Sequence, residues 1–294
     1  MTVTTRRTKG GWNRPSVRMM GVLLVCVSAG WFLPAQMMAA ESNRAALEAA
    51  IAEAREQKAV IEAVMQRLSE KRTAGEEATK AIVPVLHAPA GFLRETTVTV
   101  NDKPRLHLVE RFDPRAPADA AWEIVTVEPP ERARKLKPKH RGADGTFVMY
   151  AYTIAALEAA QATPVTPPAD GEDGVVYFRF PQVPEGLLQG DSAAFADRLT
   201  LLVGVDARAS QPFVREVRLV LEAPTRIKLI ARVKGFTWQV RYRRLSPERT
   251  IYVPERMISD AHFKIVFRGE ERTRTEIVYR DYRLRAEERA TRSP

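Results

Sequence analysis

Side chains that could bind a metal ion are sparse in this 294-residue chain. His87, His107, His140 and His262 stand far apart, and no His-Glu-x-x-His pattern joins any of them. Cys26 is the only cysteine, so the chain offers no pair of thiolate ligands and no disulfide. There is also no glycine-rich loop of the kind that cradles phosphates. The sequence therefore predicts no metal site and no cofactor.

One serine could belong to a hydrolytic site. Ser192 lies in the sequence GDSAA, which resembles the opening of a GDS-type esterase block, and Asp260 and His262 offer a carboxylate and an imidazole. The block stands far from the N-terminus, however, and these two residues are one position closer together than in such enzymes. Serine is also a preferred N-cap, and AAFADRL follows it. The sequence therefore favours a capping serine and a protein that is not an enzyme.

Cations alternate with apolar residues in the stretch RIKLIARVKGFTWQVRYRRL, residues 226–245. Because side chains alternate across a strand, this pattern predicts one apolar and one cationic face, with a turn or corner near Gly235. The cationic face would hold Arg226, Lys228, Arg232, Lys234, Arg241 and Arg243. We favour the interpretation that these cations keep an exposed sheet face soluble. The alternative is that they hold the protein against anionic lipid headgroups at a membrane surface.

The same alternation argues against nucleic acid as a partner. Single-stranded nucleic acids are bound where aromatic rings and cations converge on one groove, and here the two kinds of side chain fall on opposite faces. The formal charge of +10 is also misleading, since five of the 46 basic residues and none of the 36 acidic residues lie within residues 1–40. The rest of the chain carries a net charge of only about +5.

Residues 1–40 have the plan of a secretory signal peptide. A cationic start precedes an apolar run from Met19 to Leu33, and Pro34 and small residues follow up to Ala40. The uncharged run from Met19 to Ala40 is also long enough to span a bilayer, so a retained inner-membrane anchor is the alternative. In both cases we expect the chain after Glu41 to be exported to the periplasm.

A helix is predicted next, in a helical segment of residues 41–84. Between residues 42 and 72 the apolar positions follow a spacing of three or four: Leu47, Ile51, Ala54, Ile61, Met65 and Leu68. We favour a helix that lies on the protein's own sheet or forms a stalk. Self-association as a coiled coil is the alternative.

From residue 85 to 285 the period of the pattern changes to two, which predicts about eleven antiparallel strands. The expected strands include FLRETTVTV, RLHLVERF, AWEIVTV, TFVMYAYTI, GVVYFRF and RLTLLVGV, followed by PFVREVRLVLEAP, residues 226–245, RTIYVPERMI, HFKIVFRG and RTEIVYRDYRL. Two proline-rich segments, the basic insert 128–145 and residues 162–174, are expected to be mobile excursions. Residues 286–294 form a charged tail.

Ten apolar side chains would coat one face of this sheet and form the candidate binding surface. They are Leu219, Leu221, Ile227, Leu229, Trp238, Val240, Tyr242, Phe263, Ile265 and Phe267. The helix of residues 42–72 could cover the face, which would then be ordinary core. One alanine-rich helix has little bulk for so many strands, however, so we expect a curved sheet that leaves an apolar cavity for acyl chains.

The order of these segments resembles the LolA-like superfamily of periplasmic lipoprotein carriers and outer-membrane lipoprotein-sorting proteins. The resemblance covers about residues 85–285 and includes Val205 and Asp206 before a turn and the closing YRDYR. It implies an α+β fold in which an N-terminal helix accompanies a large antiparallel sheet that forms an incomplete β-barrel, with helices as a lid over an apolar cavity. The long basic insert after Trp122 departs from the compact carriers.

We therefore expect an exported, non-enzymatic protein of the bacterial envelope that binds a lipid, an acylated protein or another apolar ligand. The main alternative is an interaction module that pairs with a partner through its N-terminal helix and uses the sheet as a scaffold. A serine esterase is a more remote third hypothesis.

Overall fold

A computed structural model describes residues 23–73, 90–117, 120–136, 146–184, 196–227, 231–245, 251–266 and 269–284. Residues 1–22, which hold the cationic start of the expected signal peptide, lie outside this range. The chain divides into two compact units, Met1–Ser42 and Asn43–Pro294, and the second unit is described below by itself. Within the described residues, no helix combines the length and the apolar character needed to cross a membrane.

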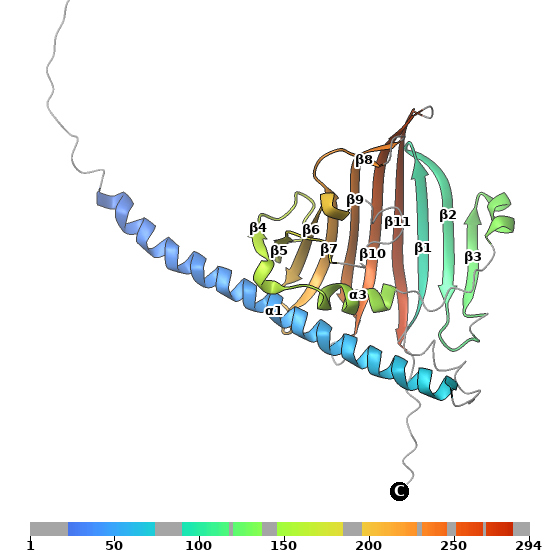
Figure 1. The fold of residues 1–294 in the computed structure, drawn as a ribbon, viewed down its shortest axis with the longest axis horizontal. Helices are drawn as coiled ribbons and strands as arrows, with labels where there is room; N and C mark the ends of the chain where they lie inside the picture. Colours follow the sequence, from blue (N-terminus) through green and yellow to red (C-terminus); the bar gives the residue numbers. More distant parts are fainter. Residues whose placement is uncertain are drawn as a thin grey trace, which may run out of the picture. The chain divides into compact units, whose positions relative to one another are not determined.

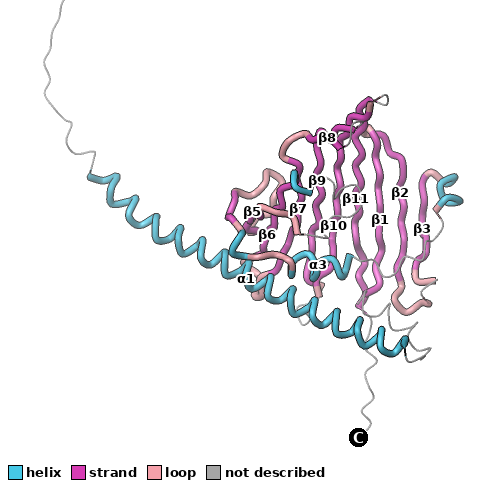
Figure 2. Tube along the Cα trace, viewed as in Figure 1, coloured by secondary structure: helices cyan, strands magenta, loops and turns pink. Residues whose placement is uncertain are grey.

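The second unit is built on one antiparallel sheet of 11 strands (Figures 1 and 2). Its strands are β1 (Ala90–Val100), β2 (Lys103–Phe112), β3 (Trp122–Glu128), β4 (Thr163–Val165), β5 (Val175–Phe180), β6 (Leu199–Asp206), β7 (Phe213–Leu221), β8 (Thr225–Ile227), β9 (Ala231–Arg244), β10 (Tyr252–Ile265) and β11 (Gly269–Leu284). They follow the order β3-β2-β1-β11-β10-β9-β7-β6-β5-β4, and β8 pairs with β9 beside this path. The sheet does not close, because β3 and β4 stand at its two ends.

Alternating sequences and short turns explain most of this sheet. Strand β1 ends in a tight turn in which Asn101 and Asp102 both adopt positive φ. Such a pair suits a two-residue hairpin because its twist matches that of the flanking strands. Strands β1 and β2 are consequently paired along nearly their full length, from Val100 opposite Lys103 to Phe92 opposite Phe112.

One predicted strand is a helix. The sequence TFVMYAYTI suggested a strand because it is rich in aromatic and β-branched residues, but Thr146–Ala155 forms helix α3. Tyr150, Ala151 and Ile154 are buried, and their spacing places them on one side of the helix. The alanines that follow favour helix over strand. Tertiary burial of one helical side therefore outweighed the β-propensity of the individual residues.

The turn or corner predicted near Gly235 is absent, and two segments that were predicted as separate strands form one. Strand β9 continues through Gly235 with a β-bulge, since His262 lies opposite Gly235 and Phe263 lies opposite Val233. Lys234 is the extra residue, so Val233 and Phe236 come to the same side of the sheet. The segments RTIYVPERMI and HFKIVFRG likewise contribute to one uninterrupted strand, β10.

The register assigns each side chain to one of two faces. The inner face carries Leu219, Trp238 and Val240, because Leu219 is opposite Trp238 and Val217 is opposite Val240. The outer face carries Glu216 and Arg241, which are opposite each other. The main core lies on the inner face, where side chains of strands β5, β6, β7, β9 and β10 pack with α1 (Leu23–Thr73) and α3. In Figure 1, α3 and the part of α1 that belongs to the second unit cross the inner face near one end of the strands.

Helix α1 packs on the sheet through its apolar side, as predicted for the first positions of the pattern. Leu47, Ile51 and Ala54 are buried, with Ala46 and Ala50 beside them. Ile61 is half-buried, and the side chains of Met65 and Leu68 lie outside the described residues. The preferred hypothesis of a helix on its own sheet is thus confirmed for this stretch.

Polar contacts hold α1 in place on both sides of its apolar stripe. Arg44 donates hydrogen bonds to the carbonyl oxygens of Ala159 (3.2 Å) and Ala162 (3.1 Å), and Arg55 donates to that of Leu157 (2.9 Å). These carbonyls lie in the segment that follows α3, so the two arginines tie α1 to that segment. On the sheet side, the hydroxyl of Tyr252 donates to Glu53 Oε2 at 2.6 Å.

A second aromatic cluster stabilises the end of the sheet formed by β1, β2, β3 and β11. Its members are Phe92, Phe112, Ala121, Val253 and Tyr279, with Trp122 and Tyr282 packed beside them. Arg94 is buried among them and bound to Glu110, with 2.7 Å between Arg94 Nη2 and Glu110 Oε2. Its guanidinium also lies over the ring of Trp122, 4.3 Å from the centroid.

Candidate functional site

The structure divides the predicted apolar surface into two parts. Leu219, Leu221, Val240 and Tyr242 are buried in the main core beneath α1 and α3. Leu219, Val240 and Tyr242 have no measurable exposure, so they can contact a ligand only if the helices move away. For these four residues, the packing matches the alternative in which the apolar face is ordinary core.

The remaining part stays partly open to solvent. We define the apolar strip as the half-buried inner-face side chains Phe236, Trp238, Met257, Phe263 and Ile277. The register joins them, since Met257 lies between Val240 on β9 and Ile277 on β11. Ile265, also predicted, is half-buried two positions beyond Phe263. The side chains of Ile227, Leu229 and Phe267 lie outside the described residues.

The strip continues across the sheet onto β1 and β2 with mixed side chains. Thr275 of β11 is opposite Ser259 on one side and Val98 on the other, and Val98 is opposite Leu106 of β2. All four are half-buried. Met257, Ile277 and Leu106 were not predicted as site residues, although the alternation in their strands could have identified them. Pairing β1 with β11, nearly two hundred residues apart, is what brings them together.

Three tyrosines lie under the helices next to the strip. The rings of Tyr150 and Tyr252 stack at a centroid distance of 4.6 Å, and Tyr242 meets Tyr150 edge-on at 5.0 Å. Burial raises the pKa of all three phenols above the ordinary value for tyrosine. Within the part of the chain that the structure describes, the buried hydroxyl of Tyr242 makes no hydrogen bond.

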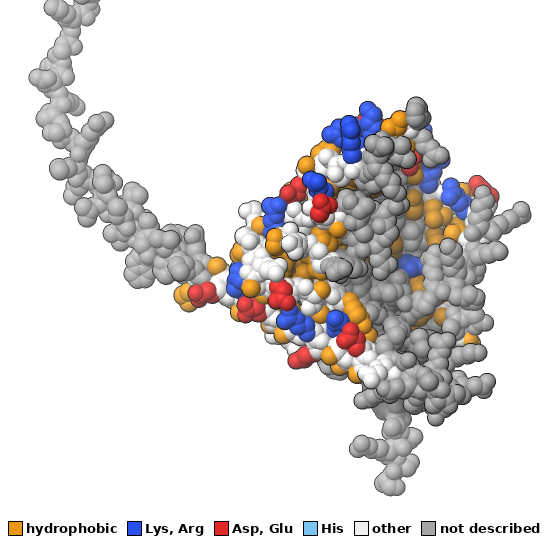
Figure 3. Space-filling model, in the orientation of Figure 1, with side chains coloured by type: hydrophobic (Ala, Val, Ile, Leu, Met, Phe, Trp, Pro, Cys, Tyr) orange, Lys and Arg blue, Asp and Glu red, His pale blue; other side chains and the backbone are white. Residues whose placement is uncertain are grey.

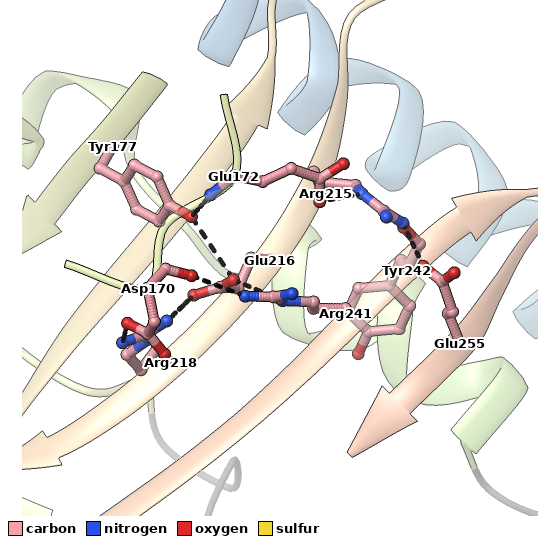
Figure 4. Close-up of polar contacts among 9 residues, drawn as sticks. All are labelled: Asp170, Glu172, Tyr177, Arg215, Glu216, Arg218, Arg241, Tyr242 and Glu255. Atoms are coloured by element: carbon pink, nitrogen blue, oxygen red, sulfur yellow. Dashed lines mark hydrogen bonds and ion pairs between the residues drawn. The ribbon is translucent and has the colours of Figure 1, made fainter. Parts of the chain in front are cut away.

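The outer face of the same strands is occupied by a buried network of charges (Figure 4). Glu216 is 1% exposed and accepts hydrogen bonds from Arg218 Nε at 2.8 Å and from Arg241 Nε at 3.0 Å. The hydroxyl of Tyr177 reaches the same carboxylate at 3.4 Å. Gly204 makes room for that ring, because a Cβ at this position would stand 3.0 Å from it. Two cations thus neutralise a carboxylate that burial would otherwise destabilise.

Two β-bulges bring a third arginine into this network. Arg215 is the extra residue of β7, and Glu255 is the extra residue of β10. The bulges direct both side chains to the outer face, where Arg215 Nη1 and Glu255 Oε2 are 2.7 Å apart. Arg215 also donates to Glu172 Oε2 at 2.9 Å and to the carbonyl oxygen of Tyr242. Burial opposes the charge of Arg215, but these carboxylates raise its pKa, so it remains a cation.

The loop from Thr166 to Gly174 closes the network, which corrects the prediction of a mobile excursion there. Asp170 Oδ1 accepts a hydrogen bond from Arg218 Nη1 at 2.7 Å, and the carbonyl oxygen of Asp170 accepts one from Arg241 at 2.9 Å. The hydrogen bond from Arg218 lowers the pKa of Asp170. Because the outer face here is filled by mutually paired charges, we interpret it as structural rather than as a binding site.

The predicted cationic face is likewise divided. Arg241 belongs to the buried network, Arg243 lies over the ring of Tyr282 at 5.1 Å, and Lys234 pairs with Glu270. Lys228 lies outside the described residues. Arg226 and Arg232 are exposed, and neither makes an ion pair with any residue that the structure describes. This last pair is therefore available for an external anion.

The alternative chemistry is not assembled within the described residues. Asp260 is held by Arg272, with its two carboxylate oxygens 2.9 and 2.6 Å from the guanidinium nitrogens, and this contact lowers the pKa of the acid. His262 Nε2 lies 3.3 Å from Glu270 Oε2. Ser192 lies outside the described ranges. Across those ranges no group of three His, Cys, Asp or Glu side chains is arranged to hold a metal ion.

Comparison with protein-family models, with curated proteins and with solved structures finds no match for this chain.

Proposed function

We propose that this protein is an exported, non-enzymatic protein of the bacterial envelope that binds a lipid or another apolar ligand on the inner face of its sheet. The apolar strip contacts the ligand, and α1 covers the neighbouring part of the face as a lid. The ligand is a lipid or the acyl chain of an acylated protein, as in the LolA-like carriers that the sequence resembles. Membership of this chain in the LolA-like superfamily is likewise proposed.

The observation that carries the proposal is the half-buried apolar strip beside a fully buried core on the same face. Monomeric proteins rarely expose contiguous apolar surface of this kind without a use for it. Phe236, Trp238 and Phe263 supply broad apolar contact, and Trp238 adds an N–H donor for a polar group of the ligand. The flanking Thr275 and Ser259 suit the junction between an acyl chain and its headgroup.

The free energy of binding would come from covering an acyl chain on the strip. Removing one methylene group from water contributes about 0.8 kcal/mol, so ten methylenes of an acyl chain contribute on the order of 8 kcal/mol. Part of that is lost to ordering the chain and the side chains that contact it. A micromolar affinity is therefore within reach of a surface that also leaves the rest of the ligand in solvent.

The test uses natively purified protein and two tryptophan variants. Mass spectrometry of a gentle organic extract should find a lipid that co-purifies with the chain. Adding a phospholipid should shift the tryptophan fluorescence of the wild type and of Trp122→Phe, and the shift should vanish in Trp238→Phe. Trp122 is the matched control because it lies on the edge strand β3 and is not one of the strip residues.

Truncation separates a binding surface from ordinary core. Trp238→Ala should weaken lipid uptake more than it lowers the free energy of unfolding. Leu219→Ala, in the closed core, should cost about 2–5 kcal/mol of stability with no separate effect on uptake. The proposal is wrong if no lipid co-purifies and if Trp238→Ala behaves like Leu219→Ala in both measurements.

A second candidate is an interaction module that uses α1. Val60 on this helix is 64% exposed, which would suit a partner helix better than solvent. In that case no lipid co-purifies, and Val60→Glu abolishes association of the chain with itself or with its partner in sedimentation experiments.

A further inference from the structure

Strands β8, β9 and β10 are paired at one tip of the sheet (Figure 1). A row of three cations, Arg226, Arg232 and Lys264, crosses these strands. Arg226 is opposite Arg232 in the pairing of β8 with β9, and Lys264 is opposite Arg232 in the pairing of β9 with β10. All three side chains are exposed. Lys and Arg side chains gather at this tip in Figure 3. Since adjacent strands are about 4.8 Å apart, the three strands of this cationic row span only about 10 Å.

The acids nearest to the cationic row are already engaged. Glu270 is opposite Lys264 in the pairing of β10 with β11. Its carboxylate, however, pairs with Lys234, the bulge residue of β9, and lies 3.3 Å from Nε2 of His262. Asp260, on the same strand as Lys264, is bound by Arg272. Among the residues that the structure describes, no carboxylate lies within ion-pair distance of the row.

This arrangement is unfavourable in the isolated protein. Like charges directly opposite each other on neighbouring strands destabilise the pairing. The row contains two such pairs side by side, and Glu270, the described carboxylate opposite Lys264, pairs with Lys234 instead. An external anionic surface would relieve the repulsion, so the row is complementary in charge to a negatively charged partner.

The neighbouring side chains indicate what kind of anion this is. Val266, two residues after Lys264, is 49% exposed at the end of β10. Cations beside an exposed apolar side chain suit the headgroup region of a bilayer, where phosphates meet the first methylenes. A soluble polyanion would leave the exposed valine without a contact.

We propose that the cationic row and Val266 dock this protein on an anionic lipid bilayer. The inference deepens the proposed function, because a carrier of lipid must meet the bilayer at the end of its binding face. Phe263 of the apolar strip is the residue before Lys264 and points to the inner face, so the strip begins at the tip that docks. Lipid could then pass between bilayer and strip without crossing the outer face.

The test compares two triple variants of the full chain on phosphatidylcholine vesicles that contain about one third phosphatidylglycerol. The docking variant is Arg226→Gln, Arg232→Gln and Lys264→Gln. In flotation at low salt its vesicle partition coefficient should fall roughly fivefold for each cation removed, or on the order of 100-fold in total. Wild-type binding should weaken as salt rises and should be absent on pure phosphatidylcholine.

The matched control removes the same charge elsewhere, with Arg111→Gln, Arg179→Gln and Arg280→Gln. These arginines are exposed and pair with Glu123, Glu222 and Glu95, so binding should change by less than about threefold. Val266→Ser should weaken vesicle binding but not binding to polyphosphate. Equal losses in both triple variants, or binding to polyphosphate with none to vesicles, would overturn docking on a bilayer.

These outcomes are independent of the proposed function. The docking variant should still take up a dispersed single-chain lipid, measured by the Trp238 fluorescence shift. If uptake fails in the wild type while vesicle binding follows the row, then the carrier proposal fails and the docking proposal stands.

Discussion

Replacing Glu216 by glutamine should reveal how much the buried outer-face network contributes to stability. The carboxylate is 1% exposed and faces Arg218 at 2.7 Å and Arg241 at 3.0 Å. Removing one partner from a buried ion pair typically costs about 3–5 kcal/mol, because the remaining charge has lost both water and its counter-ion. Glutamine keeps the volume and one carbonyl acceptor, so the loss isolates the charge.

Two features of the structure place the expected cost near the lower limit. Arg218 retains Asp170 at 2.7 Å, although that aspartate side chain is 65% exposed, and the side chain of Arg241 is 24% exposed and can be hydrated. We therefore expect Glu216→Gln to lower the free energy of unfolding by about 3 kcal/mol. With a urea m-value of about 3 kcal/mol/M for a chain of this size, the midpoint falls by about 1 M.

Urea unfolding followed by circular dichroism at constant pH measures this shift, provided that the m-value is unchanged. The control is Glu222→Gln, which removes an outer-face ion pair whose side chains are 48% and 53% exposed and should cost less than about 1 kcal/mol. Combining Glu216→Gln with Arg241→Gln should cost less than the sum of the single changes, because they share one contact. Equal midpoints for the Glu216 and Glu222 variants would refute the argument that burial makes this pair strong.

Three further predictions use the same unfolding assay or probe single contacts. Tyr252→Phe should cost about 1.5–3 kcal/mol, because it removes the hydrogen bond to the carboxylate of Glu53 on α1, and Glu53→Gln should restore much of it in the double variant. Gly204→Ala should cost about 1–3 kcal/mol, since the added Cβ would stand 2.7 Å from a methyl group of Val175; a cost below 0.5 kcal/mol would show that this spot is not tightly packed. The pKa of Asp170 is lowered in the fold, so its contribution to stability is present above its unfolded pKa of about 4 and is lost as the pH falls through the lower folded value. Proteolysis of its loop should therefore rise in acid in the wild type and already be high at pH 7 in Asp170→Asn.

Local periodicity determined most of the strands. The alternation in FLRETTVTV, RLHLVERF and RLTLLVGV predicted β1, β2 and β6, because a half-buried strand needs apolar side chains on one face only. The spacing of Leu47, Ile51 and Ala54 similarly predicted the buried side of α1. The predicted strands are not separated by long helices, as they would be in a parallel sheet. The sequence therefore predicted an antiparallel sheet, and the structure confirms it.

Periodicity failed where the signal depends on distant partners. The residues of α3 have strand-like propensity. They form a helix because the helical spacing of Tyr150 and Ile154 lets both side chains pack in the core with α1 and β10. The loop around Asp170 has the composition of a mobile segment, but Arg218 and Arg241 hold it from strands many residues later. Propensity describes a residue's neighbours in the chain, whereas these outcomes depend on neighbours in space.

The sequence by itself determined which side chains share a face: Trp238, Val240 and Tyr242 alternate with Gln239, Arg241 and Arg243 wherever the strand goes. Only the tertiary structure decided which part of each face is closed. The path of α1 and α3 buried Val240 and left Trp238 half-exposed, and the register placed Arg226, Arg232 and Lys264 in one row while Arg241 met Glu216. The physical reason is that alternation is a property of one strand, whereas burial and charge pairing depend on which strands and helices lie beside it.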